Sequence, residues 1–148
     1  STRLNALPTY TMPSVTTALA VSPDGRWLAI SGYHEVFLMD AQTLSLKGRL
    51  LGESPRIESI AFSPDSQHLA VAAGAPARFG EIQVWNVAGT NQVHAWRTGT
   101  DSTYGVSWSP YGRQLAFGGA DKTVRVFNNR GKAHYLLDVY AVVLADAP

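Results

Sequence analysis

The chain has 148 residues, about the length of one ordinary domain, and a formal net charge of +1, which implies no basic surface for nucleic acid. Hydrophobic residues make up 45% and charged residues 16%, a balance that excludes a disordered chain. Cysteine is absent, which excludes disulfides, thiolate zinc sites, haem attachment through C-x-x-C-H and a cysteine nucleophile.

A turn motif recurs along the chain. Ser22-Pro23-Asp24-Gly25 returns as Ser63-Pro64-Asp65-Ser66 and as Ser109-Pro110-Tyr111-Gly112, at intervals of about 41 and about 46 residues. Proline presets φ in such a turn, and Asp and Gly tolerate the positions that follow. Short runs of Val, Ile and aromatic residues flank each copy, which is typical of β-strands.

We expect four strands in each repeat and no helix, because no segment keeps a 3.6-residue period. In the first repeat the expected strands are Val15–Ser22, Trp27–Ser31, Glu35–Asp40 and Ser45–Leu51. In the second they are Ile57–Ser63, His68–Ala72, Glu81–Val87 and Gln92–Arg97. In the third they are Tyr104–Ser109, Gln114–Phe117, Thr123–Asn128 and Ala133–Leu137.

The first strand of each repeat alternates large side chains with small ones, as Leu19 and Val21 do with Ala18 and Ala20. We therefore expect both of its faces to be buried, as where radially packed sheets crowd toward an axis. This predicts an all-β fold, a β-propeller of four-stranded antiparallel blades. The expected units are a terminal strand or linker at 1–14, blades at 15–55, 56–102 and 103–138, and the start of a further blade or closing strand at 139–148.

The repeats resemble those of the WD40 family over about residues 15 to 137. The Trp-Asp pair that names the family stands in altered form as Met39-Asp40, Trp85-Asn86 and Phe127-Asn128. The Gly-His pair of the family is missing, so its buried Asp-His-Ser-Trp network is not expected here. The resemblance implies a WD40-like propeller with about three blades plus partial blade strands in this chain.

Four stretches resemble the WD40 region of bacterial proteins that join a planctomycete-type cytochrome c domain to a propeller. They are residues 31–36, 56–59, 80–85 and 104–109. This resemblance implies an exported, periplasmic parent protein. Without cysteine, any haem chemistry would lie outside these residues, and we expect neither a cofactor nor a metal in the chain itself.

The candidate site is a binding surface, since no catalytic constellation stands out and the chain is not expected to be an enzyme. The residues that we expect at the ends of strands and in turns on one face are Tyr33, His34, Arg56, Glu58, Asp101 and Tyr104. An insertion in the second repeat, Ala75–Gly80, adds Arg78 and Phe79, a pair that could anchor a partner or merely cover the end of the sheet.

Three blades cannot close a ring, because known propellers have about four to eight. We therefore expect a homo-oligomer, with a head-to-tail homodimer favoured, or completion by the missing blades of a parent chain. The expected function is a non-catalytic scaffold that binds another protein or peptide, without nucleic acid or membrane insertion. The alternative is an accessory propeller domain of a larger exported redox (cytochrome c-type) or hydrolytic enzyme.

Overall fold

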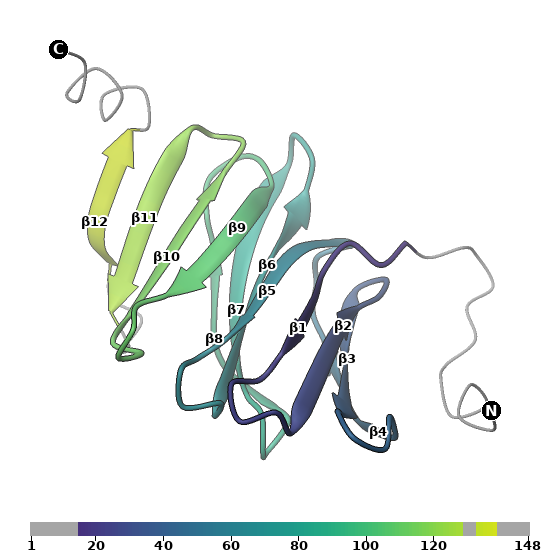
Figure 1. The fold of residues 1–148 in the computed structure, drawn as a ribbon. Coiled ribbons are helices and arrows are strands. Elements are labelled where there is room, and N and C mark those ends of the chain that lie inside the picture. Colours follow the sequence, from purple (N-terminus) through teal and green to yellow (C-terminus); the bar gives the residue numbers. More distant parts are fainter. Residues whose placement is uncertain (1–14, 129–132, 139–148) are drawn as a thin grey trace, which may run out of the picture.

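The computed structural model describes residues 15–128 and 133–138, which form twelve strands and, within these residues, no helix. The strands make three four-stranded antiparallel sheets, which we call blades 1, 2 and 3 (Figure 1). The all-β prediction is therefore confirmed. The expected segments 1–14 and 139–148 lie outside the described residues.

Each blade follows the chain from its inner to its outer strand. Blade 1 consists of β1 (Leu19–Val21), β2 (Trp27–Ser31), β3 (Glu35–Asp40) and β4 (Leu46–Leu51). Blade 2 consists of β5 (Arg56–Phe62), β6 (His68–Ala75), β7 (Phe79–Asn86) and β8 (Asn91–Arg97). Blade 3 consists of β9 (Thr103–Trp108), β10 (Gln114–Gly119), β11 (Thr123–Asn128) and β12 (Ala133–Asp138).

The insertion in the second repeat lengthens strands rather than a loop. β6 and β7 have eight residues each, and their pairing continues to Ala75 opposite Phe79. Only residues 76–78 remain as the turn between them. The first expected strand is shorter than predicted, because β1 contains only Leu19–Val21 of the expected Val15–Ser22.

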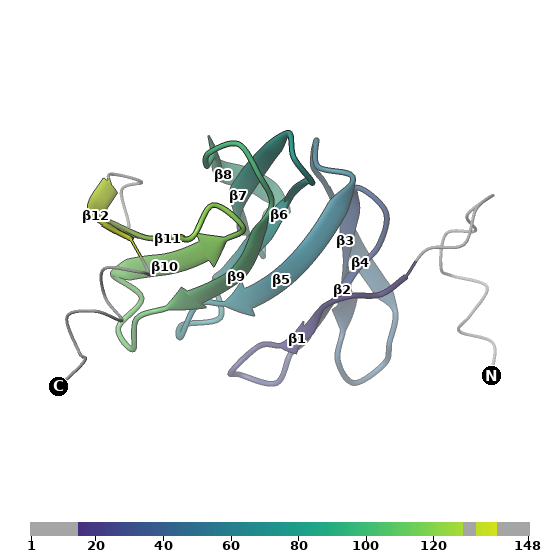
Figure 2. The same ribbon diagram turned by 90° about the horizontal axis from the view of Figure 1, so that it is seen from above.

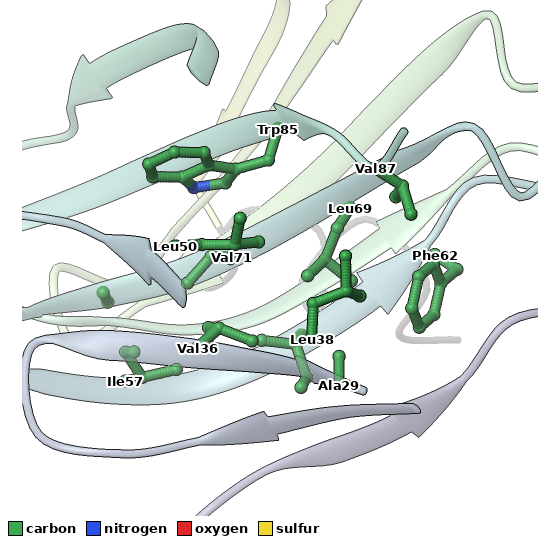
Figure 3. Packing of buried hydrophobic residues seen from close by; sticks show 12 residues of the cluster. Ala29, Val36, Leu38, Leu50, Ile57, Phe62, Leu69, Val71, Trp85 and Val87 are labelled. Carbon is green, nitrogen blue, oxygen red and sulfur yellow. The ribbon is translucent and has the colours of Figure 1, made fainter. Parts of the chain in front are cut away.

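The inner strands β1, β5 and β9 lie beside one another, and the sheets fan out from them without closing a ring (Figure 2). Two apolar cores join the blades. The first unites blades 1 and 2, where Leu38 and Leu50 meet Leu69 and Val71 (Figure 3). The second unites blades 2 and 3 and includes Ile82 and Phe117. This arrangement is a partial propeller held together between its blades.

Burial is strongest in the blade that has a neighbour on both sides. Ile60 on β5 is 8% exposed, whereas Leu19, which holds the same repeat position on β1, is 66% exposed. On β5 the large side chains are buried and the small ones, Ser59 and Ala61, are half-buried. The expectation of two buried faces is wrong for β1, where Leu19 and Val21 are exposed, and for β9, where Gly105 and Ser107 are exposed. For β1 the reason is that the described residues place no preceding sheet against Leu19.

A chain of buried polar side chains ties the linker before blade 2 to the middle of that blade. The Ser54 hydroxyl donates to the Glu81 carboxylate, and the Gln83 amide donates to the same carboxylate at 3.0 Å. The Trp85 indole N–H then donates to Gln83 Oε1 at 2.9 Å. These bonds satisfy polar groups that would otherwise be costly to bury, and they fix the linker that carries β5.

Candidate functional site

The three sheets have two opposite edges. We call one edge the linker face; it carries the β2–β3, β6–β7 and β10–β11 turns and the linkers between blades. We call the other the hairpin face; it carries the β1–β2, β5–β6 and β9–β10 turns. All eight candidate residues come from turns, a linker or strand beginnings at the linker face. The topology therefore gathers them on one side, although not in one place.

A groove of about 520 Å³ opens on the linker face at the junction of blades 1 and 2. We call it the linker-face groove, and it is lined by Val15, Thr17, Gly32, Tyr33, Pro55, Arg56, Ile57 and Pro76. It brings together Tyr33 and Arg56, two candidates from different blades. The junction beneath it is tied, because the Thr17 hydroxyl donates to the Ile57 carbonyl.

The polar groups at this groove are held by their neighbours. Arg56 Nε lies 2.7 Å from Glu58 Oε1, and the arginine side chain remains 59% exposed. The Tyr33 ring stands edge-on to His34 with centroids 4.1 Å apart, and Tyr33 is 57% exposed. His34 adopts φ 62°, the left-handed conformation of a tight turn. An exposed aromatic ring and an exposed guanidinium thus stand at the same opening.

Glu58 and Tyr104 occupy equivalent irregularities on successive inner strands. The pairing of β5 with β6 skips Glu58, and the pairing of β9 with β10 skips Tyr104. Bulges of this kind redirect a side chain out of the regular alternation. Glu58 uses that direction to pair with Arg56, whereas Tyr104 is 52% exposed and lies outside the groove lining.

The Arg78–Phe79 pair divides into an exposed and a covered residue. The Arg97 guanidinium lies over the Phe79 ring, 4.2 Å from its centroid, and Arg97 also pairs with Glu53 at 3.1 Å. Arg78 is exposed in the turn. Neither residue lines the linker-face groove, so the contact around Phe79 matches the interpretation in which it covers the end of the sheet.

Asp101 organises backbone rather than facing the groove. Its Oδ1 accepts hydrogen bonds from the Ala77 N–H at 3.0 Å and the Ser102 N–H at 2.7 Å. These two bonds hold the pKa of Asp101 below its usual value. The carboxylate thereby ties the β8–β9 linker to the β6–β7 turn and keeps the linker face in shape.

A second groove, missed by the sequence analysis, lies on the hairpin face at the junction of blades 2 and 3. Its volume is about 380 Å³. We call it the hairpin-face groove, and it is lined by Ser63, Asp65, His68, Val84, Val93, His94, Trp108, Tyr111, Gly112 and Arg113. The available signal in the sequence was Tyr111, which stands where the first two turns have Asp24 and Asp65.

No group of three or more His, Cys, Asp or Glu side chains in the described part of the chain is placed to hold a metal ion. Among the same residues, no helix of the length and apolarity needed to cross a bilayer is present. The chemistry that these two grooves offer is that of exposed aromatic rings, guanidinium groups and hydrogen-bond donors. Such groups are typical of contact residues in interfaces.

Residues 90–128 match the family model described as WD domain, G-beta repeat. The match covers β8 to β11, so the sequence repeat begins in the outer strand of blade 2 and continues through three strands of blade 3. The unit defined by sequence therefore crosses a blade junction.

Several curated proteins are similar to this chain over most of its length. A WD repeat-containing protein of Synechocystis sp. is 28% identical over 68% of the chain and 28% of its own length. Protein groucho of Drosophila melanogaster is 30% identical over 73% of the chain and 15% of its own length. Transducin-like enhancer protein 2 of Mus musculus is 29% identical over 73% of the chain and 14% of its own length.

The chain thus spans less than a third of the length of each of these relatives. The similarity to these relatives and the match to the family model agree with the three four-stranded sheets of the fold. The chain is thus similar to WD40 repeat proteins, both in sequence and in its four-stranded sheets.

Proposed function

We propose that the chain is a non-catalytic protein-interaction module that binds a segment of a partner in the linker-face groove. The observation that carries this proposal is the meeting of Tyr33 and Arg56 from two blades at one opening of about 520 Å³. That volume suits a few side chains of a peptide. WD40 repeat proteins are generally non-catalytic scaffolds, which agrees with a binding role.

The groove offers a partner both apolar and polar contacts. Pro55 and Pro76 give rigid walls, Tyr33 gives an exposed ring, and the Arg56–Glu58 ion pair gives one charge of each sign at the rim. Tyr and Arg are the residue types that most often dominate binding energy in interfaces. On the same face, Tyr104 and Arg78 would contact a longer partner segment.

The test is a selection of phage-displayed random dodecapeptides against the full chain, followed by affinity measurements on the selected peptides. We expect the double variant Tyr33→Ser/Arg56→Gln to weaken their binding at least about tenfold, the loss of one good anchor. Lys122→Gln, in the equivalent turn of blade 3, serves as the control and should bind as the wild type does. Selected peptides that bind the double variant equally well would contradict the proposal.

We further propose that a second copy of the chain completes the ring. This second part of the proposal rests on the uncovered sides of blades 1 and 3. Ile60 and Phe62 pack into the core between blades 1 and 2, and their equivalents Leu19 and Val21 are 66% and 57% exposed. The receiving surface in blade 3 would be formed by the half-buried Val124 and Val126. Two copies would give six blades, within the known range.

Light scattering tests the homodimer directly. We expect twice the chain mass of 16.0 kDa, and we expect Val21→Lys to reduce it to one chain. Leu44→Lys is the control, because Leu44 is 45% exposed but lies in the β3–β4 turn. A wild-type chain that stays at 16.0 kDa at high concentration would contradict the dimer.

The second candidate function is an accessory propeller domain of a larger exported redox or hydrolytic enzyme, as the cytochrome c-type resemblance implies. The small share of each relative that the chain covers favours a longer parent protein. Further blades of that parent would then cover Leu19 and Val21. A native reading frame that carries C-x-x-C-H beside these repeats would support this candidate over the homodimer, and a frame without it would oppose the redox form.

A further inference from the structure

The third turn of the hairpin face departs from the other two. In the second turn, Asp65 Oδ1 accepts hydrogen bonds from the Ser63 hydroxyl at 2.5 Å and the Gln67 N–H at 3.0 Å. The third turn keeps the serine, whose Oγ accepts from the Gln114 N–H at 3.0 Å, but has Tyr111 in place of the aspartate. A side chain that closes the turn has been replaced by a ring that is 87% exposed.

Tyr111 replaces an aspartate that would stabilise the turn, and its ring is exposed instead. Residues that lower local stability in this way are expected at functional positions. Tyr111 stands at the hairpin-face groove, where its neighbour Trp108 also contributes to the lining. The Trp108 indole N–H donates to the Ala61 carbonyl at 3.0 Å, which fixes the ring across the blade junction. The Trp108 ring of this groove is therefore already in position.

The lining residues that come from blade 2 include two imidazoles. The His94 ring stacks on Trp96 with centroids 5.1 Å apart. The His68 ring lies 6.4 Å from Trp108. Each imidazole can donate an N–H to a ligand oxygen in either protonation state. Two imidazoles thus line the same groove of about 380 Å³ as Trp108 and Tyr111.

Two charged side chains line this groove, Arg113 and Asp65. Arg113 is exposed, and it makes no ion pair with any residue in the described ranges. Asp65 also lines the groove, but its Oδ1 is engaged by its own turn. A guanidinium that forms no ion pair with the described residues, close to the fixed Trp108 ring, suits a carboxylate whose neighbouring residues are apolar.

We propose that the hairpin-face groove binds an acidic side chain carried on an extended segment of a partner protein. Arg113 pairs with the carboxylate, the two imidazoles donate to its oxygens, and Tyr111 and Trp108 pack against the flanking side chains. This site lies on the opposite face from the linker-face groove and extends the proposed binding function to a second surface.

The experiment is an NMR titration of the full chain with blocked peptides Gly-X-Glu-X-Gly, in which X is Leu, Tyr or Pro, and with their Gln counterparts. We expect saturable shifts at Tyr111, Trp108 and Arg113, and a Kd about three to ten times lower for Glu than for Gln peptides, the range of one partly exposed charged hydrogen bond. Equal affinities, no saturable shift with any peptide, or shifts confined to Tyr33 and Arg56 would each overturn the proposal.

Two variants separate binding from folding. Tyr111→Asp restores the residue type of the other two turns, so we expect unchanged or higher thermal stability together with at least fivefold weaker binding of the Glu peptides. Arg113→Gln should bring their affinity down to that of the Gln peptides. Wild-type affinity in either variant would overturn the proposal.

Arg26→Gln provides the matched control for the charge. Arg26 holds the turn position of Arg113 in blade 1 but does not line the groove, so its loss should leave the affinity unchanged. An equal loss of affinity in Arg26→Gln and Arg113→Gln would show a general charge effect and contradict the assignment. Binding in the linker-face groove is tested separately with variants of Tyr33 and Arg56. A failure of that proposal can therefore be distinguished from a failure of this one.

Discussion

Blades 2 and 3 have the same strand order but very different burial. In β7, at the middle of blade 2, six of the eight residues are buried, whereas in β11 of blade 3 none is fully buried. Blade 2 has a neighbouring sheet on both sides, and blade 3 has one on a single side within the described residues. The core of this molecule therefore belongs to the junctions between blades rather than to any blade alone.

The largest expected effect on stability comes from shortening the side chain at one repeat position, which we compare between blades 2 and 1. Ile60→Ala removes a side chain that is 8% exposed, and we expect it to lower the free energy of unfolding by about 2–4 kcal/mol. Leu19→Ala changes the equivalent side chain, which is 66% exposed, and should cost less than about 0.5 kcal/mol in a single chain. Urea unfolding monitored by tryptophan fluorescence measures both.

Measurements at several protein concentrations separate the loss of stability within a single chain from any effect of association between chains. At concentrations where light scattering gives a single chain, the contrast between the two variants should be at its largest. If a second copy covers β1, the cost of Leu19→Ala should rise with protein concentration. Equal costs in single chains would contradict the view that burial at a junction determines the contribution of this position.

A smaller effect is expected from breaking the polar chain in blade 2. Gln83→Ala leaves the Trp85 indole N–H and the Glu81 carboxylate without their shared partner in a buried place. The cost of such unsatisfied groups is about 1–3 kcal/mol. Gln92→Ala on the exposed strand β8 is the matched control and should be nearly neutral. Thermal unfolding of both variants measures the difference. Equal melting temperatures would contradict a stabilising role for the hydrogen bonds of Gln83.

The same contrast explains how much the sequence could predict. The strands Trp27–Ser31 and Glu35–Asp40 match their predicted bounds because side-chain type and turn chemistry act locally. The exposure of Leu19 could not be predicted, since it depends on which sheet lies beside it. The polar chain through Glu81 and Gln83 was also missed, because an alternating polar pattern alone does not distinguish a buried side from a solvated one.

The candidate site was predicted with similar limits. Topology placed the turns of one face together, which is why Tyr33 and Arg56 meet at the linker-face groove. Phe79 lies under Arg97, which is distant in sequence, and no local pattern indicates such a contact. The hairpin-face groove needed the packing of two blades before the substitution of aspartate by Tyr111 acquired a meaning.

The smallest expected effect on stability concerns the turns of the hairpin face, where blades 2 and 3 also differ. The hydrogen bond from the Ser63 hydroxyl holds the pKa of Asp65 below the usual 3.8, and the Gln67 N–H adds to this. A carboxyl group whose pKa is lowered on folding stabilises the fold above its unfolded pKa, and this stabilisation is lost as pH falls through the lower, folded value. Asp65→Asn should therefore lower the melting temperature slightly at pH 7.

That difference should shrink as the pH falls below about 3.8 and vanish once wild-type Asp65 is protonated. The third turn already has Tyr111 in this position, so Tyr111→Asn should show no comparable dependence on pH. Melting curves of the wild type and both variants from pH 7 down to the acid transition measure this. A pH-independent difference for Asp65→Asn would mean that the turn is stabilised by the shape of the side chain rather than by its charge.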